Sequence, residues 1–408
     1  MARQGRDASN PLTPQKWLRK FMPYALEENV FARLNLMGSD DSNMIVVHKD
    51  LTKSVGKLVR MPMLGELTGV GGGDNFNSAD IAEAYKSFYF DVPVHERGNT
   101  TILEGPMAAQ HMIEDWSSEA TSKLGRWLGR MQELELIRAL SGLYNLSTDV
   151  ESVNELAPST GRIAYGGETA AGAIDTLSAF GDSTAIGAYS TGTKLTTDAL
   201  LSNETPTDVL MGPNFLEKVV IEFMDSEPRP RLLTIGGVKC LLFIMTTKQA
   251  VAMKHNITYK NNNMYAQVRG DKNPLLSTSL GFWPCGETMV LLQSYGRMET
   301  RTGAAAQLAP EEGFTLNAGR TETSDPVASG ETVGRGLLLG AGAGAIAYGS
   351  TKNGQLVERL NGDVDSGTGR KPLKGIETVM GVSKTVFKDK AGTAQEDYAV
   401  MAVDTCQQ

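Results

Sequence analysis

A long, uninterrupted helix that directly follows a β-ribbon most limits the folds open to this chain. Between residues 106 and 140, apolar residues recur at intervals of three or four, which predicts one helix with a single buried stripe. A helix over these residues would span roughly 50 Å, far more than the three or four turns usual in a globular domain. A long core helix of an α+β enzyme would give the same pattern. We expect the buried stripe to consist of Ile113, Trp116, Ala120, Leu124, Trp127, Met131 and Leu134.

Two extended segments precede this helix and predict a long two-stranded ribbon. Residues 44–67 and 87–103 both show apolar side chains at every second position, as a half-buried strand does. An isolated ribbon is only marginally stable in water, so we expect its apolar face to pack on a neighbouring subunit. The face consists of Phe88, Phe90, Val92 and Val94. The predicted flexible tip of the ribbon contains Gly71, Gly72, Gly73, Asp74 and Asn75.

The charge and the cysteines of the chain exclude several classes of protein. The net charge is −8, whereas phosphate affinity comes mainly from clustered Lys and Arg, so a nucleic-acid-binding protein is disfavoured. The three cysteines are widely scattered and fit neither a zinc site nor a disulfide framework, which indicates folding in a reducing cytoplasm. No stretch reaches the roughly 18 apolar residues of a membrane-spanning helix.

The rest of the chain divides into structured segments and insertions. Residues 145–203 are rich in Ser, Thr, Gly and Ala and predict a surface elaboration, since a structureless loop of that length is unusual in a compact domain. A hairpin is expected around Gly236 and Gly237, which form a two-residue primed-turn signal. Helices are expected over 213–224 and 248–255, a strand over 289–295, a second insertion over about 302–330, and closing strands over 377–387 and 398–404.

The chemical motifs in the sequence are incomplete. Residues 340–345 fit a relaxed dinucleotide-binding fingerprint, but the βαβ unit that this fingerprint needs is missing, so we interpret them as close packing of a helix through small residues. His111, Glu114 and Asp115 share a helix face, but a metal site would need a second such cluster. The chain has no nucleophile elbow and no Walker loop. We therefore predict no catalytic, cofactor-binding or metal-binding residues, and no enzyme activity.

The order of these elements resembles one known architecture, and three groups of residues carry the likeness. The first runs from Gly73-Asp74-Asn75 through Phe88-Tyr89 to Asp91 and Arg97; the second from Leu124-Gly125-Arg126-Trp127 to Leu140-Ser141-Gly142; the third from Gly381-Val382-Ser383-Lys384-Thr385-Val386-Phe387 to Asp397-Tyr398 and Val403-Asp404-Thr405. In order and spacing they resemble the phage N-four-like family of major capsid proteins, which have a Hong Kong 97-type fold.

The resemblance implies an α+β, Hong Kong 97-like fold divided into the parts of such a subunit. Residues 1–45 would be an N-terminal arm, 46–105 an extended loop formed by the β-ribbon, and 106–145 the spine helix of a peripheral domain. Residues 146–205 would be a surface insertion, 206–350 an axial domain with its own insertion at about 302–330, and 351–408 the closing strands of the peripheral domain.

The resemblance also implies a function: self-assembly into the icosahedral head shell of a tailed bacteriophage that encloses the DNA genome. The main partner would be the chain itself, in hexameric and pentameric capsomers, with portal, scaffolding and decoration proteins and non-specifically held DNA as further partners. The protein would be part of the virion after folding in the host cytoplasm, with no cofactor and no membrane. Two alternatives are another phage assembly protein, of the tail or baseplate, and an α/β nucleotide-binding enzyme.

Overall fold

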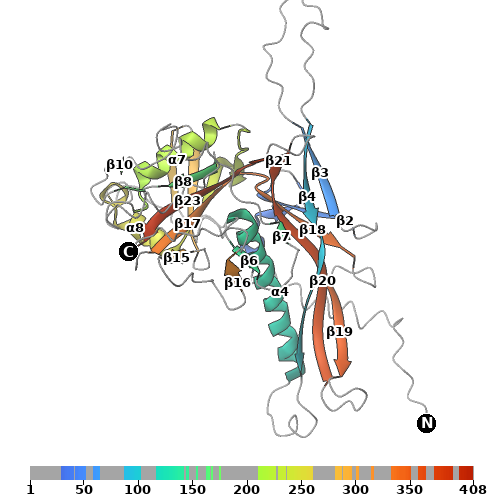
Figure 1. Ribbon diagram of the computed structural model, residues 1–408. Helices are drawn as coiled ribbons and strands as arrows, with labels where there is room; N and C mark the ends of the chain where they lie inside the picture. Colours follow the sequence, from blue (N-terminus) through green and yellow to red (C-terminus); the bar gives the residue numbers. More distant parts are fainter. Residues whose placement is uncertain are drawn as a thin grey trace, which may run out of the picture.

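The computed structural model describes residues 29–40, 42–51, 58–64, 87–102, 116–141, 144–146, 153–154, 162–165, 167–168, 174–175, 210–226, 228–235, 237–260, 281–286, 288–295, 300–302, 314–316, 332–350, 357–363, 372–388 and 395–407. These residues form an α+β fold with two large sheets and one long helix, α4 (Figure 1). The predicted fold class, α+β, is therefore confirmed.

The long helix predicted from the sequence is α4, Trp116–Ser141. Its 26 residues correspond to a length of about 39 Å; residues 106–115 lie outside the described parts of the chain. The first half is amphipathic: Leu124 and Leu128 are buried against Val357 and Ile376 of the neighbouring sheet. The opposite face is exposed at Lys123, Arg126 and Arg130, as the sequence predicted. The second half differs, because residues 132–141 are buried on every side.

The first large sheet has seven strands in the described parts of the chain, arranged around one long strand, β20 (Pro372–Lys384). Along its first half, β20 pairs with β19 and β5; along its second half it pairs with β18 and β7. Strand β2 lies parallel to β18 and β1. The bounds are β1 Met37–Gly38, β2 Ile45–Leu51, β5 His95–Ile102, β7 Val153–Asn154, β18 Gly344–Gly349 and β19 Val357–Asp363.

The second large sheet has eight described strands, in the order β13–β14–β12–β17–β23–β8, with β11 paired to β12 and β15 to β17. The predicted hairpin is confirmed by β11 and β12, and Gly237 in its turn has a φ of +83°, a conformation that favours glycine. The bounds are β8 Ile163–Tyr165, β11 Leu233–Ile235, β12 Val238–Met245, β13 Gly281–Cys285, β14 Thr288–Ser294, β15 Thr300–Thr302, β17 Thr332–Leu339 and β23 Val400–Gln407.

Two helices, α7 (Pro213–Asp225) and α8 (Thr247–His255), cover one face of the eight-stranded sheet. The alternation of side chains along β12 explains this arrangement: Leu241, Phe243 and Met245 point toward the helices, whereas Leu242 and Ile244 belong to the core on the other face. Both helices were predicted from the sequence. Pro213 stands at the first turn of α7, and Thr246 with Gln249 forms a capping box at the start of α8.

Short strands complete the described structure. A four-stranded sheet has the order β22–β21–β4–β3, and β9–β10 and β6–β16 form two-stranded pairs. The remaining bounds are α2 Val30–Arg33, β3 Leu58–Leu64, β4 Ser87–Pro93, β6 Tyr144–Leu146, β9 Gly167–Glu168, β10 Ile174–Asp175, β16 Phe314–Leu316, β21 Val386–Lys388 and β22 Gln395–Asp397.

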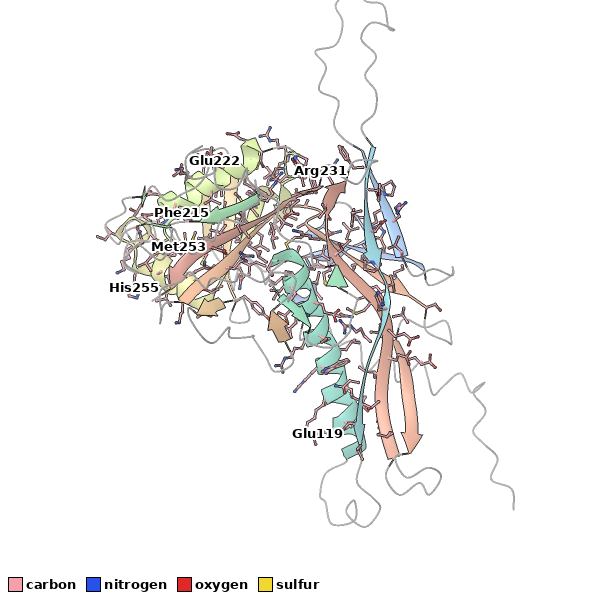
Figure 2. The ribbon with its side chains drawn as sticks, viewed as in Figure 1. Glu119, Phe215, Glu222, Arg231, Met253 and His255 are labelled. Atoms are coloured by element: carbon pink, nitrogen blue, oxygen red, sulfur yellow. The ribbon has the colours of Figure 1, made fainter. Side chains whose placement is uncertain are left out.

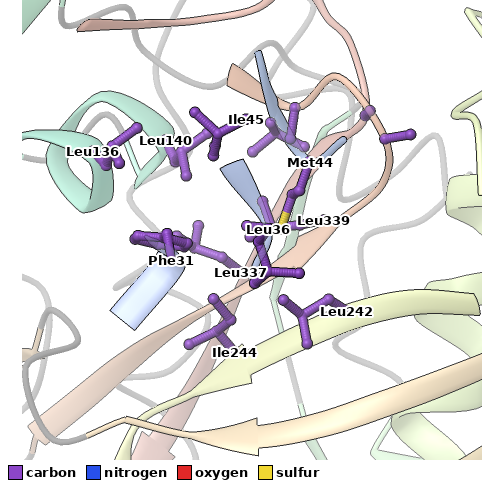
Figure 3. Close-up of a cluster of buried hydrophobic side chains, with 14 of the residues drawn as sticks. Phe31, Leu36, Met44, Ile45, Leu136, Leu140, Leu242, Ile244, Leu337 and Leu339 are labelled. Atoms are coloured by element: carbon purple, nitrogen blue, oxygen red, sulfur yellow. The ribbon is translucent and has the colours of Figure 1, made fainter. Parts of the chain in front are cut away.

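The two large sheets share one hydrophobic core, shown in Figure 3. Leu136 and Leu140 from the end of α4 meet Ile45 of the seven-stranded sheet and Leu242 and Leu337 of the eight-stranded sheet. Each of these side chains is at most 1 % exposed, so they stabilise the contact between the sheets by the removal of apolar surface from water. The two halves of the subunit are therefore packed against each other rather than joined by a linker alone.

The chain crosses between the two sheets more than once, and this differs from the predicted domain boundaries. Strand β18 falls within 206–350, the segment expected to form a separate axial domain, yet it pairs with β2 and β20 of the seven-stranded sheet. Strand β23 falls within 351–408, expected to return to the peripheral domain, yet it lies between β17 and β8. The predicted boundaries placed neighbouring segments of the sequence in the same domain, because the sequence does not show which strands pair over long distances.

The segment predicted as an N-terminal arm ends inside the shared core. Phe31, Leu36 and Met44 are buried there, next to Ile45, so residues 31–45 are part of the folded body rather than an extended arm. Residues 1–28 lie outside the described parts of the chain.

Candidate assembly site

The β3–β4 ribbon predicted from the sequence is present, with Met61 opposite Phe90 and Val59 opposite Val92. Its apolar face is not free, because Phe90, Val92 and Val94 are buried in a cluster with Ala345 and Ala347 of β18. Phe88 meets the ring of Phe387 edge to face at 4.8 Å between centroids. The sequence predicted that a neighbouring subunit covers this face. That prediction was wrong for these residues, since a segment far along the same chain covers them.

The other face of the ribbon is polar and faces outward. The guanidinium group of Arg60 on β3 donates two hydrogen bonds to the carboxylate of Asp91 on β4, at 2.8 and 3.1 Å, and lies over the ring of Tyr89 at 4.3 Å from its centroid. Arg60 is 59 % exposed, and exposed ion pairs of this kind contribute only about 0–1 kcal/mol to stability. The pair therefore adds little to the stability of the ribbon and leaves a polar outward surface for contact with other molecules.

Several of the predicted assembly and helix residues cannot be placed. Gly71, Gly72, Gly73, Asp74 and Asn75, the predicted ribbon tip, lie outside the described residues, as does Ile113 of the predicted spine stripe. Their assigned roles stay predictions.

The described residues of the predicted spine stripe are buried to different extents. The backbone of Trp116 begins α4, and Leu124 is 4 % exposed in the core that the helix forms with β19 and β20. Trp127 packs against this cluster but is only half-buried, and Met131 is half-buried as well. Leu128, which the predicted stripe left out, is 2 % exposed and belongs to the same cluster.

A cluster of buried charges lies where α4 meets β5, and the sequence analysis missed it. Glu135 and Arg138 come from the second half of α4, and Arg97 comes from β5. All three are at most 6 % exposed. Arg97 contacts the carboxylate of Glu135 at 2.5 Å. A carboxylate buried to this degree is retained only with cationic partners, so the pair fixes how the helix sits on the sheet.

Burial also shifts the charge state of Glu135. Loss of hydration raises the pKa of its carboxyl group from the ordinary value of 4.5 to about 7, while the guanidinium groups of Arg97 and Arg138 act in the opposite direction. This carboxyl group therefore changes protonation near neutral pH, well above the range of an exposed glutamate.

We predict that the free energy of unfolding falls as pH rises from about 4.5 to about 7. The pKa of Glu135 is higher in the folded chain than in the unfolded chain, so the native state binds more protons across this window. The effect is at most about 3 kcal/mol. Thermal melts at about pH 5 and about pH 7.5 test it in the native chain and in Glu135→Gln. The loss between the two pH values should be smaller in the variant; equal losses would contradict the prediction.

A second buried ion pair joins the two central strands of the eight-stranded sheet to the end of α4. Arg335 on β17 donates two hydrogen bonds to the carboxylate of Asp404 on β23, at 2.8 and 2.7 Å, and a third to the backbone carbonyl of Ser141 at 3.0 Å. Nearby, the ammonium group of Lys384 meets Asp397 at 2.7 Å where the chain crosses from β20 to β22. The Arg335–Asp404 pair connects the eight-stranded sheet to α4, and the Lys384–Asp397 pair connects the end of β20 to β22.

Parts of the segment expected to be a surface insertion, 146–205, are buried instead. Glu168 on β9 accepts hydrogen bonds from the backbone nitrogens of Asn214 and Phe215, at 2.9 and 3.2 Å, and so caps the first turn of α7. Arg162 is 2 % exposed and donates to the carbonyl of Pro228. Strand β8 also extends the eight-stranded sheet beside β23. The prediction of a surface elaboration was therefore wrong for Arg162, strand β8 and strand β9.

The glycine-rich run at 340–345 connects two strands and opens no helix. The backbone nitrogen of Ala341 donates to Arg231, and that of Gly342, which has a φ of +72°, donates to Asn43. A Cβ at Gly340 would lie 2.6 Å from the carbonyl oxygen of Arg231, so close backbone contact explains these small residues. The interpretation as a packed helix was wrong, and the strand–turn–helix context of a dinucleotide site is not formed here.

Other chemical sites are not formed in the described parts of the chain. Those residues contain no group of three or more His, Cys, Asp or Glu placed to bind a metal ion; His111, Glu114 and Asp115 lie outside them. Cys240 and Cys285 are free and buried, and burial raises the pKa of their thiols to about 11 and about 12, which makes them poor nucleophiles. None of the described helices has the length and apolar character of a membrane span.

Comparison with solved structures finds phage capsids. The fold is similar to the capsid of Ralstonia phage GP4 with a TM-score of 0.67 at 17 % identity, covering 93 % of this chain and 92 % of that one. It is also similar to the cyanophage Pam1 capsid, with a TM-score of 0.62 at 16 % identity, covering 93 % and 92 %. The head structure of Helicobacter pylori bacteriophage KHP40 gives a TM-score of 0.59 at 14 % identity, covering 93 % and 91 %. At these identities the likeness concerns the fold.

Sequence comparison supplies the family. A search of curated proteins finds no significant match, whereas the family profile described as phage capsid protein matches residues 8–408, nearly the whole chain. The chain therefore belongs to the phage capsid protein family, and it is a major capsid protein that forms the head shell of a tailed phage.

Proposed function

We propose that this protein is a Hong Kong 97-type shell subunit that assembles into hexameric and pentameric capsomers of a closed icosahedral head. The seven-stranded sheet with α4 would be the peripheral domain, and the eight-stranded sheet with α7 and α8 the axial domain near the capsomer centre. Within the predicted loop 46–105, the β3–β4 ribbon would be the extended part that reaches a neighbouring subunit, because β2 and β5 belong to the seven-stranded sheet. Portal, scaffolding and decoration proteins and the enclosed DNA would be further partners, and the chain would fold in the host cytoplasm before it enters the virion.

The observation that carries this proposal is the long layer that extends from the shared core. Helix α4 and strands β5, β19 and β20 run side by side away from the eight-stranded sheet (Figure 1). At 3.3 Å per residue, the 13 residues of β20 alone span about 40 Å. An extended and internally braced layer of this kind suits a wall that must tile a surface, because each copy presents long edges to several neighbours.

The chemistry of the chain also suits a container. A net charge of −8 gives little affinity for phosphate backbones, so the inner surface would hold DNA without binding a particular sequence.

Electron microscopy of the purified full-length chain tests the proposal. We expect hollow, closed particles of uniform diameter in negative stain after expression in bacteria. Small soluble oligomers would contradict the proposal, and so would open tubes or plates, which a tail or baseplate subunit would give.

The ribbon tip provides a second test of the extended-loop role. We predict that deletion of residues 67–76, with a short turn to join β3 and β4, leaves a folded subunit that assembles poorly. The apolar face of the ribbon is covered by the chain's own β18, so the fold does not depend on the tip. Sedimentation should show a loss of particles while circular dichroism stays unchanged. Normal particles from the deletion variant would show that the tip makes no essential contact between subunits.

A further inference from the structure

The outward side of α7 is acidic around one exposed apolar residue. Ile221 is 45 % exposed, whereas most other large apolar side chains of the helix are buried and Met224 is partly buried. Glu217 and Asp225 lie one helical turn before and after Ile221, and Lys218 and Glu222 lie one turn apart on the same outward side. We call Glu217, Lys218, Ile221, Glu222 and Asp225 the acidic α7 face, because its three carboxylates outnumber its one cation, Lys218.

The outward side of α8 has the same plan with the opposite charge. Val251 and Ile257 are 49 % and 56 % exposed. Lys248 precedes Val251 by almost one turn, and Lys254 and His255 follow it by one turn. The sequence from 247 to 260 contains no acidic residue that could neutralise them. We call Lys248, Val251, Lys254, His255 and Ile257 the basic α8 face.

Both faces belong to the helical layer over the same face of the eight-stranded sheet, but they lie at different places on it. Figure 2 labels Glu222 near one end of this layer and His255 near the other. Each face has apolar side chains at its centre and charges at its edge, which is the usual anatomy of a protein–protein contact. The exposure of Ile221, Val251 and Ile257 shows that the described residues of the chain leave both faces open.

We propose that the acidic α7 face of one subunit docks against the basic α8 face of a neighbouring copy of this chain. The inference rests on the proposed self-assembly and names two surfaces through which neighbouring subunits would bind each other. Opposite charges steer the two faces together and fix their register, and the apolar centres lose contact with water on docking. Two different surfaces meet, so after one contact each of the two copies still has one unused face, basic in one copy and acidic in the other. Such contacts therefore continue from copy to copy until a ring closes.

The complementary pair of faces favours a second copy over DNA as the occupant of the basic α8 face. Contacts to a phosphate backbone depend on cations and gain nothing from exposed valine and isoleucine side chains. The same chain also supplies a surface with three carboxylates, one lysine and an exposed isoleucine, which is complementary to the basic α8 face in net charge and shares its apolar character. One pair of short helices is smaller than a standard interface of about 1,600 Å², so this contact acts as one of several within an assembly.

Charge reversal of each face, alone and together, tests the proposal in the full-length chain. Lys248→Glu with Lys254→Glu reverses the basic α8 face, and Glu222→Lys with Asp225→Lys reverses the acidic α7 face. Each double variant should lower the yield of sedimentable particles by about tenfold or more, because like charges would then meet at the contact. The combination of all four substitutions should restore particles, since opposite charges face each other again.

The matched control is Lys123→Glu with Lys239→Glu, which changes the net charge equally at exposed positions outside both faces. It should assemble normally. Circular dichroism melts should be unchanged in every variant, because the substituted side chains lie on the outside of the subunit. If a glutamate variant melts lower, Lys248→Gln with Lys254→Gln provides a milder change that should still reduce assembly.

The outcomes separate this inference from the proposed function. If the native chain forms no closed particles, the proposed function fails. If the native chain forms particles and both reversed variants also form them at normal yield, the docking inference alone is wrong. Normal particles that hold less DNA after reversal of the basic α8 face would assign that face to the nucleic acid and overturn the inference. Failure of the four-substitution variant to recover, with unchanged folding, would also count against direct contact between the two faces.

Discussion

Asp404→Ala is expected to destabilise the folded subunit by about 3–5 kcal/mol, because it leaves the buried guanidinium group of Arg335 without its carboxylate. Asp404 is fully buried and Arg335 is 5 % exposed, so water cannot replace the lost partner. The pair lies between β17 and β23 at the centre of the eight-stranded sheet, and Arg335 also donates to the last turn of α4. Urea unfolding of the purified subunit measures the loss; insoluble expression would be the extreme form of the same result.

A double variant distinguishes loss of the pair from loss of its volume. Arg335→Met with Asp404→Leu replaces both charges by apolar side chains of similar size, and such replacements of buried pairs are often close to neutral. We expect it to recover most of the stability lost in Asp404→Ala, although the carbonyl of Ser141 would lack its hydrogen bond. If Asp404→Ala unfolds at the same urea concentration as the native chain, the ion pair contributes nothing to stability and this prediction is wrong.

Gly381→Ala is expected to destabilise the subunit by about 3 kcal/mol or more, at the upper end of the range for overpacked cores. A Cβ at this position would overlap the carbonyl oxygen of Pro93 and lie 2.8 Å from its carbonyl carbon. Both are backbone atoms, so no side-chain rotation relieves the clash, and either β20 or the junction of β4 and β5 must move. A lower melting temperature and a loss of protease resistance are the expected measurements.

Gly98→Ala is the matched control for this effect. Gly98 pairs with Glu377 of the same strand β20. A Cβ there would lie 3.1 Å from the carbonyl oxygen of Ile376 and 3.8 Å from Cα and Cβ of Glu377, which is an ordinary contact distance. We expect a much smaller change in melting temperature. If both substitutions lower the melting temperature equally, the contact between Gly381 and the backbone of Pro93 is not the cause of the effect at position 381.

Both sites lie where segments distant in sequence meet, which bears on the role of the subunit in a shell. Gly381 allows the ribbon strand β4 to pass over β20, and Arg335 with Asp404 connects α4 to the eight-stranded sheet. Loss of either contact would disturb the arrangement of the ribbon, the long helix and the two sheets. A tiling subunit needs that arrangement to be the same in every copy.

Much of the local structure could be predicted from the sequence. The spacing of apolar residues predicted α4, and turn glycines predicted the β11–β12 hairpin; both are confirmed. The helices α7 and α8 and the strand β14 also agree closely with the predicted ranges. These features depend on residues a few positions apart, whose side chains share a face through the periodicity of the helix or strand.

The candidate site was predicted less well. The register of the β3–β4 ribbon follows from its alternation, but the surface that covers Phe90 and Val92 comes from β18, more than two hundred residues later. The buried charges at Arg97, Glu135 and Arg138 had no signal in the sequence. Charged residues in a helix usually face water, and only the packing of two sheets around the end of α4 buries these.

The sequence by itself determined the secondary structure of the long helix, the ribbon and the hairpin, together with the acidic net charge of the chain. The tertiary structure alone decided that β18 belongs to the seven-stranded sheet and β23 to the eight-stranded sheet. It also decided that Glu168, in a segment expected on the surface, caps α7. It also decided which charges are buried. The physical reason is that periodicity depends on local backbone geometry, whereas strand pairing between distant segments depends on the free energy of a core that forms only once all of them are together.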